Sequence, residues 1–292
     1  MTRTGSYNLR RDTLRMHHLD LILPITVIVI AEFLLFLGNM KAAIAVHAMN
    51  IMMLVFLEML FTDRTYPAIM LLSLFRILNV TMPVFFKLTL YSYATIYLPM
   101  FLPIYMIMRD GTFDRQAAGI TLRGFWAYLP LAISVGFALG FGEYCVLKPE
   151  ILVPEVNLKS ILILSAVMIL LVGLMEEFIF RSLLQNIIME RIGSTPGLLA
   201  SSMVFGLMHS GYHLPMELVY VFFAGIVFGV MFWSTKSLPI IAITHGVTNI
   251  SLFLVVPAFP YYLPYFIGIP LLIHVILGGV IRKIRTCESS PP

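Results

Sequence analysis

Three short stretches in an otherwise apolar sequence carry side chains that could hydrolyse a peptide bond. These side chains belong to Glu176, Glu177, Arg181, His209, His245 and Asn249. An ionisable group in an apolar run is costly, and by default it marks a functional site. A buried carboxylate near a histidine suits general-base activation of water, and further hydrogen-bond donors suit a developing oxyanion.

Helical spacing suggests different roles for the two glutamates. Adjacent helical residues differ in direction by about 100°, so Glu176 and Glu177 are not expected to point squarely at one site. Glu177 and Arg181 are four residues apart with the acid first, which is the favourable order for a helical ion pair. We therefore expect Glu177 mainly to neutralise Arg181 and Glu176 to face the site. His245 and Asn249 are also four residues apart and share one helical face.

The convergence of these side chains has more than one interpretation. The first is hydrolysis by a water held between Glu176 and His209, with His245 and Asn249 donating to the oxyanion. The second is a zinc site, although the sequence has no His-Glu-x-x-His helix and asparagine is a poor zinc ligand. The third is structural, with buried polar groups joining helices. A proton-coupled transporter is a further alternative, although no paired, Gly- or Pro-interrupted segments indicate an inverted repeat.

The composition indicates the elements that must position these groups. Of 292 residues, 60% are hydrophobic and 12% charged, with a mean hydropathy of +0.94; soluble domains carry roughly 25% charged residues. We expect an all-α fold, a polytopic membrane helix bundle of about ten transmembrane helices. The expected segments lie near residues 19–38, 41–61, 66–85, 88–108, 124–143, 159–190, 195–212, 214–233, 238–256 and 262–281.

The basic residues predict the orientation of these segments. Of the 19 lysines and arginines, all but five fall at the ends that share a side with the N-terminus, Arg181 among them. The exceptions are Lys41, Lys87, Lys148 and Lys159 on the other side and Arg76 within a span. This bias places both termini in the cytoplasm, and we expect the protein in the cell membrane. The loop 144–159, with Glu143 nearby, should face outward. The basic residues flank apolar segments, so they do not indicate a nucleic-acid partner.

Depth along the helices brings the candidate residues to one level. Glu176 and His209 each lie about 20 Å from the inner side, on segments joined by the short turn 193–197. These two segments should therefore be antiparallel neighbours. His245 and Asn249 should reach a slightly shallower level on a segment that also starts inside.

The chain is expected to have two membrane parts and a tail. Residues 1–110 form N-terminal accessory helices without obvious chemistry, 111–286 form the catalytic domain, and 287–292 form a polar tail. Within the accessory part, Glu32 and Arg76 lie at comparable depth, which predicts an interhelical ion pair that locks the bundle; a second functional site is the alternative. Cys145 and Cys287 lie far apart and indicate neither a disulfide nor a metal site.

The motifs Glu176-Glu177-x-x-x-Arg181, Phe205-x-x-x-His209 and His245-x-x-x-Asn249 resemble those of the CAAX protease and bacteriocin-processing (Abi) family of intramembrane endopeptidases. This family includes the type II CAAX prenyl endopeptidases, which remove the last three residues of prenylated proteins. The resemblance covers roughly residues 120–281.

The resemblance implies a glutamate-type endopeptidase without a cofactor, although metal dependence stays open. On that pattern Glu176 and His209 activate water, His245 and Asn249 form the oxyanion hole, and Glu177 and Arg181 support the site. In prenyl-processing relatives the site opens to the cytosol and sideways to lipid, and the depths above lead us to expect the same here.

We therefore expect an intramembrane endopeptidase that cleaves near the C-terminus or the membrane-proximal region of a protein. Its partners would be the lipid bilayer and a membrane-associated protein or peptide, with or without a prenyl group. The alternatives are a non-catalytic membrane partner or immunity-type binding protein of the same fold, and the transporter.

Overall fold

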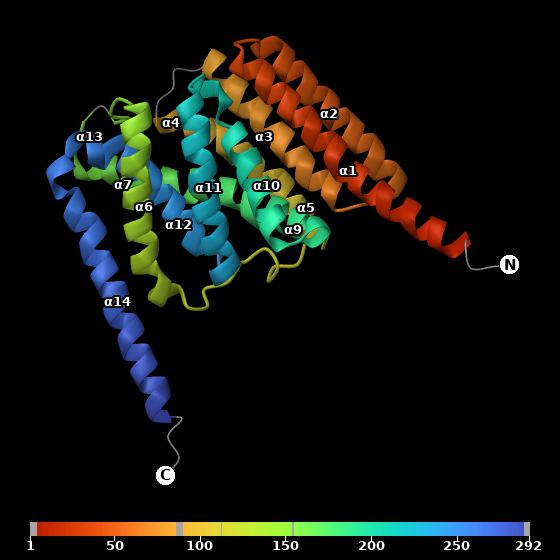
Figure 1. Ribbon diagram of the computed structural model, residues 1–292. Helices are drawn as coiled ribbons and strands as arrows, with labels where there is room; N and C mark the ends of the chain where they lie inside the picture. Colours follow the sequence, from red (N-terminus) through yellow and green to blue (C-terminus); the bar gives the residue numbers. More distant parts are fainter. Residues whose placement is uncertain (1–4, 86–89, 112, 154, 289–292) are drawn as a thin grey trace.

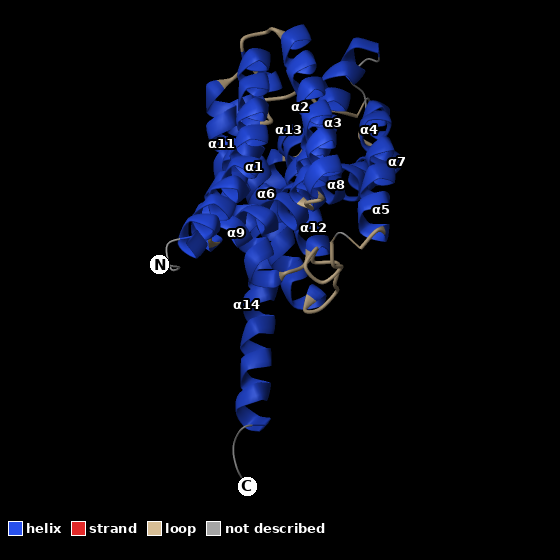
Figure 2. Ribbon diagram, turned by 90° about the vertical axis from the view of Figure 1, so that its right-hand side faces the viewer, coloured by secondary structure: helices blue, strands red, loops and turns tan. Residues whose placement is uncertain are grey.

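The structure, a computed structural model, describes residues 5–85, 90–111, 113–153 and 155–288, and these contain helices and loops but no strand (Figure 2). The expected all-α fold is confirmed. Arg3 and Lys87, used above to predict the orientation, lie outside the described residues, as do residues 289–292 of the expected tail.

The helices follow the order of the expected segments (Figure 1). They are α1 (Gly5–Phe36), α2 (Met40–Phe61), α3 (Thr65–Phe85), α4 (Leu90–Tyr97), α5 (Phe101–Arg109), α6 (Phe125–Leu147), α7 (Leu158–Ala166), α8 (Leu174–Glu177), α9 (Asn186–Ile192), α10 (Ser194–Leu207), α11 (Pro215–Thr235), α12 (Leu238–Ile250), α13 (Val256–Ala258) and α14 (Leu263–Glu288). Because α14 continues to Glu288, the expected tail begins within this helix.

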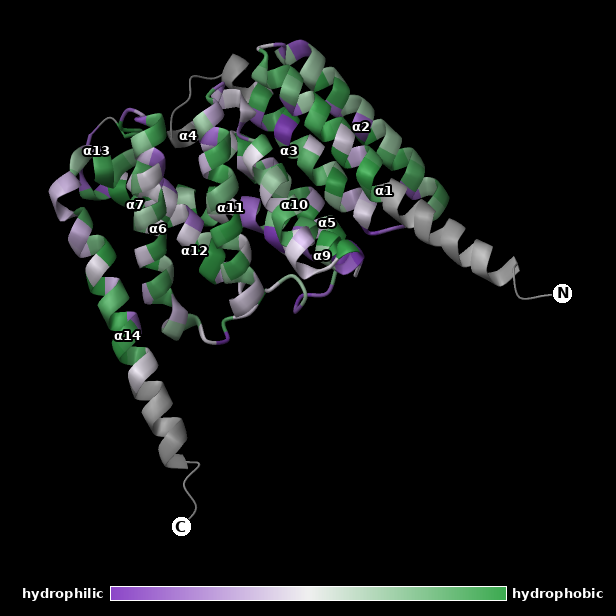
Figure 3. Ribbon diagram, viewed as in Figure 1, coloured by the Kyte–Doolittle hydropathy of each residue, from purple (hydrophilic) through white to green (hydrophobic). Residues whose placement is uncertain are grey.

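Six helical stretches of the described chain are long and apolar enough to cross a membrane. They are Met40–Phe61, Phe125–Leu147, Leu158–Ile192, Pro215–Thr235, Leu238–Ala258 and Pro260–Gly279. Apolar residues cover much of the outer helices (Figure 3), where Met59 is 79% exposed. The chain is thus an integral membrane protein, while the expected number of about ten spans stays a prediction.

Two π-helical segments interrupt the long stretch Leu158–Ile192. They are Val167–Gly173 and Phe178–Gln185, and the four residues of α8 between them carry Glu176 and Glu177. A third π-helical segment, Ser251–Val255, follows α12 directly. A π turn closes its hydrogen bonds over five residues instead of four, and such turns are frequent at functional sites.

Glycines allow α12 to pack against both α6 and the stretch around α8. A Cβ atom added at Gly140 of α6 would lie 2.3 Å from the carbonyl oxygen of Thr248, and one at Gly173 would lie 2.4 Å from that of Ala242. Small residues at such crossings let helix backbones approach closely in a membrane. This close approach places α12, which carries His245 and Asn249, beside the two glutamates of α8.

The helices give the bundle two ends, which we name the terminal end and the distal end. The terminal end has the start of α1, the last turn of α14 and the connections 62–64, 113–124, Gly193 and 236–237. The distal end has the connections 37–39, 148–153, 208–214 and 259–262. In Figure 1 the turn between α1 and α2 is at the top, whereas α14 ends at the bottom.

At the terminal end, an ion pair joins the turn between α2 and α3 to α9. Asp63 accepts hydrogen bonds from the backbone nitrogen of Thr65 at 2.8 Å and from a guanidinium nitrogen of Arg191 at 2.7 Å. Partial burial by itself would raise the pKa of Asp63, but the hydrogen bonds from Thr65 and the positive charge of Arg191 outweigh it and lower this pKa below its usual value. This carboxylate therefore links the accessory helices to the second part of the chain.

Candidate active site

A cavity of about 540 Å³ lies among the helices, and it is lined by all four residues expected to carry the reaction. These residues are Glu176, His209, His245 and Asn249. They come from α8, the connection after α10, and α12, so the structure brings together the three stretches of the sequence. Asn249 is half-buried and lies one helical turn beyond His245.

The two adjacent glutamates lie on either side of the His245 ring. Nδ1 of His245 is 2.7 Å from Oε1 of Glu177, and Nε2 is 3.9 Å from Oε2 of Glu176. The ring also stacks on Phe228, with 5.2 Å between the ring centroids. If Nδ1 donates to Glu177, then Nε2 can donate to an oxyanion only when the ring is an imidazolium.

Glu177 forms the expected ion pair with Arg181 but is not limited to it. Nε of Arg181 is 2.9 Å from Oε2 of Glu177, and both side chains are fully buried. The guanidinium also lies 4.6 Å from the centroid of the Phe205 ring, which suits a cation–π contact. Glu177 thus holds both Arg181 and His245. Counting Arg181 among the basic residues of the inner end was wrong, because this side chain lies in the core.

Tyr97 donates a hydrogen bond from its hydroxyl to Oε1 of Glu176. Tyr97 is 2% exposed and stacks on Tyr93, with 6.2 Å between the ring centroids. The first four segments, expected to carry no obvious chemistry, thus contribute a contact to a candidate catalytic residue. One signal was present in the sequence, since a buried tyrosine hydroxyl usually needs a partner and Tyr93 and Tyr97 share one helical face.

His209 lies just beyond α10, which ends at Leu207, and not within a longer helix as expected. Its Nδ1 is 3.0 Å from the carbonyl oxygen of Phe205 and can only donate there, because that oxygen is an acceptor. In the neutral ring this leaves Nε2 as an acceptor. His209 is half-buried and stacks on Tyr212, with 6.3 Å between the ring centroids. The ring is thus held in place while one nitrogen can accept a proton.

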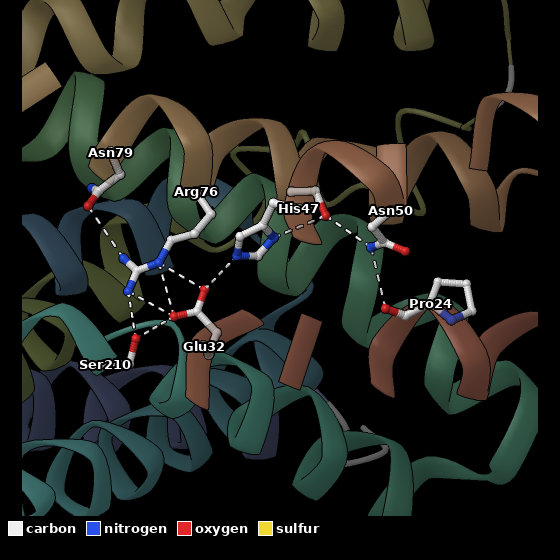
Figure 4. Close-up of polar contacts among 8 residues, drawn as sticks. Pro24, Glu32, His47, Asn50, Arg76, Asn79 and Ser210 are labelled. Carbon is white, nitrogen blue, oxygen red and sulfur yellow. Dashed lines mark hydrogen bonds and ion pairs between the residues drawn. The ribbon is translucent and has the colours of Figure 1, made fainter. Parts of the chain in front are cut away.

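The predicted pair of Glu32 and Arg76 is confirmed, and it reaches the residue next to His209 (Figure 4). Nε of Arg76 is 2.8 Å from Oε1 of Glu32. The Ser210 hydroxyl donates to Glu32 at 2.5 Å and accepts from Arg76 at 2.9 Å. His47 contacts the same carboxylate at 3.2 Å. The pair and its contacts therefore join α1, α2 and α3 to the connection 208–214, which carries His209, and Arg76 also lines the cavity.

Glu143 was expected near the outward-facing loop 144–159, but its side chain is buried in the structure. It is 8% exposed and lines the cavity, and Glu217 is also fully buried. Glu143 therefore adds a carboxyl group to the cavity lining that the sequence did not indicate.

A preformed metal site was the second interpretation of the motifs. Within the described ranges, no three His, Cys, Asp or Glu side chains are placed to hold a metal ion. Glu177 is instead engaged with Nδ1 of His245 and with Nε of Arg181.

Residues 158–251 match the family model for type II CAAX prenyl endopeptidases, Rce1-like. This match contains all seven residues of the three motifs and confirms the resemblance inferred from them. It supports a membrane endopeptidase in general. Tyr97, Glu32 and Arg76 lie outside it. No curated protein and no solved structure matches the chain.

Proposed function

We propose that this protein, with its segment similar to CAAX prenyl endopeptidases, is an intramembrane glutamate-type endopeptidase. It hydrolyses a peptide bond near the C-terminus or the membrane-proximal region of a protein substrate. The observation that carries this proposal is that Glu176 and His209 line one cavity while Nε2 of His209 is left without a partner among the described residues. The proposal includes catalytic roles for Glu176, His209, His245 and Asn249.

In the proposed reaction, Glu176 and His209 hold a water between them. Glu176 takes a proton from this water as its oxygen attacks the carbonyl carbon of the scissile bond. The carbonyl oxygen becomes an oxyanion, which accepts hydrogen bonds from His245 Nε2 and the Asn249 amide. The C–N bond then breaks, and the proton passes from Glu176, with His209 as an alternative carrier, to the leaving amine.

The supporting residues position these groups. Glu177 accepts from Nδ1 of His245 and so fixes the orientation of the ring and directs Nε2 into the cavity. Arg181 balances the charge of Glu177 in a site where an unpaired charge would be costly. Tyr97 holds one oxygen of Glu176, which leaves the other for the water.

The wider organisation is part of the same proposal. The protein lies in the cell membrane, with both termini in the cytoplasm. Residues 111–286 form the catalytic domain. Residues 1–110 form the accessory part, and the contacts of Tyr97 and Ser210 make it necessary for the site.

The test is cleavage of membrane-anchored peptides, with and without a prenyl group, by the purified full chain. Glu176→Gln and His209→Ala should each lower kcat by roughly a hundredfold to ten-thousandfold, the usual contribution of general-base catalysis. Glu150→Gln, at an exposed carboxylate of the distal end, is the matched control and should keep full activity. Activity should survive a chelator.

Two outcomes would count against the proposal. Loss of wild-type activity on chelation, with recovery on adding zinc, would assign the reaction to metal chemistry. A Glu176→Gln variant that cleaves nothing yet supports the full cellular function would identify a non-catalytic binding protein of the same fold.

A further inference from the structure

The catalytic cavity lies in the distal half of the bundle. Its exposed lining residues are Gly38, Gly211, Tyr212 and His213, all in connections of the distal end. Its buried residues, such as Glu176 and Phe180, lie near the middle of the stretch Leu158–Ile192. The cavity therefore extends from mid-depth to the distal end.

The described part of the terminal end contributes nothing to this lining. None of the described connections 62–64, 113–124, Gly193 and 236–237 lines the cavity. Below the catalytic residues the core is filled by large apolar side chains, among them Leu183, Leu184 and Phe232, each essentially fully buried. A substrate thus has an opening at the distal end and a packed core toward the terminal end.

The charges of the sequence distinguish these two ends. Even with Arg181 removed from the count, the terminal end keeps most of the lysines and arginines, whereas the distal end has Lys41, Lys148 and Lys159 among the described residues. An excess of basic residues in short connections marks the cytoplasmic side. The mouth of the cavity is therefore on the side away from the cytoplasm.

We propose that the active site receives its substrate from the non-cytoplasmic side of the membrane. The substrate class is then a polypeptide whose cleaved segment is exposed at the outer surface, close to the bilayer. This inference rests on the proposed endopeptidase function. It departs from the expectation that the site opens to the cytosol, which came from prenyl-processing relatives.

The side chains that line the cavity indicate which kind of substrate segment would fit it. Aromatic and aliphatic side chains predominate, among them Leu35, Met40, Tyr93 and Tyr212, and Glu143 adds a carboxyl group. At about 540 Å³ the cavity has the size of a small-ligand site, so it takes a short extended segment and not a folded domain. The substrate accordingly presents a flexible end with apolar or aromatic side chains.

Orientation is tested first, with the two natural cysteines as reporters. Cys145 is exposed near the distal end of α6, and Cys287 belongs to the last turn of α14 at the terminal end. The variants Cys287→Ser and Cys145→Ser each keep one of them. A membrane-impermeant maleimide added to right-side-out spheroplasts should label Cys145 and not Cys287, and inside-out vesicles should show the reverse. The reverse pattern in spheroplasts would overturn the proposal.

Entry is tested in a variant that lacks both natural cysteines. Gly211→Cys fits this position, because its added Cβ atom would have its nearest contact at 3.6 Å, the Arg76 guanidinium. A bulky impermeant maleimide applied from outside should lower cleavage at least tenfold relative to the same variant before labelling. Glu150→Cys, at the same end but away from the cavity, should be labelled without loss of activity. A second position at the mouth, His213→Cys, serves if Gly211→Cys does not fold.

The outcomes keep the two proposals apart. If labelling follows the expected sides but no peptide is cleaved, the endopeptidase function fails while the orientation of the mouth stands. If cleavage proceeds and the maleimide blocks it only from the cytoplasmic side, the endopeptidase function stands and entry from outside is refuted.

Discussion

Replacing Tyr97 by phenylalanine should slow catalysis without weakening substrate binding. The change removes only the hydroxyl that donates to Glu176. The ring would keep its stacking on Tyr93 and its contact with Phe75, whose ring centroid lies 5.4 Å away. Without this bond the Glu176 carboxylate gains freedom to rotate, so the water it holds spends less time in line with the scissile carbonyl.

The size of the effect follows from the type of bond. A hydrogen bond to a charged group contributes about 1.5–3 kcal/mol. If all of it is lost in the transition state, kcat falls by roughly tenfold to a hundredfold, because 1.4 kcal/mol corresponds to a factor of ten. The Michaelis constant should change less than about twofold, since the bond orients a catalytic group and does not touch the substrate.

The assay is steady-state cleavage of a membrane-anchored peptide by wild type, Tyr97→Phe and Tyr93→Phe. Tyr93→Phe is the matched control, because Tyr93 lines the same cavity and no hydrogen bond from it to Glu176 is found. Thermal unfolding in detergent should give similar midpoints for all three proteins. Full activity of Tyr97→Phe, or an equal loss in both variants, would refute the positioning role of the hydroxyl.

Three further changes test the packing and the charges of the fold, each by thermal unfolding in detergent. Gly140→Ala should cost about 1–3 kcal/mol, because its Cβ atom would overlap a backbone carbonyl of α12; Gly268→Ala, with open space around it, is the control. Asp63→Asn should lower the midpoint at pH 7, since a carboxylate whose pKa is lowered by folding contributes stability above its unfolded pKa of about 4. This difference from wild type should disappear as the pH falls through the folded pKa, and a constant difference would contradict the linkage. Glu32→Gln and Arg76→Gln should each cost about 3–5 kcal/mol by leaving a buried charge unpaired, and the double variant should recover part of that loss; additive losses would show that the two residues act independently.

Spacing and depth along the helices were sufficient to predict two ion pairs. The four-residue interval predicted the pair of Glu177 and Arg181 within one helical stretch, and comparable depth predicted the interhelical pair of Glu32 and Arg76. Both signals follow from the regular rise and turn of a helix. The helical order of the chain could be read in the same way from the lengths of its apolar runs.

Contacts that depend on the rotation and tilt of whole helices could not be predicted. The bond from Tyr97 to Glu176 joins residues 79 positions apart. The contact of Glu177 with His245 depends on how α8 and α12 face each other, which no periodicity in either helix specifies. The end at which the cavity opens depends on where large side chains fill the core and where they leave space. For this reason the depths of the motif residues could not indicate at which end the cavity opens.

The π-helical segment Phe178–Gln185 implies that this stretch tolerates a change in length better than regular α-helix does. A π turn contains an additional residue relative to an α turn, so deleting one residue there would restore regular α-helix. Because the turn then closes with one residue fewer, α9 and the turn that leads to His209 would keep roughly their orientation relative to Glu176 and Glu177. In regular α-helix, by contrast, a one-residue deletion turns everything beyond it by about 100°. A one-residue deletion within α10 should therefore separate the motifs more than one in this segment outside Arg181, even though every motif residue is retained.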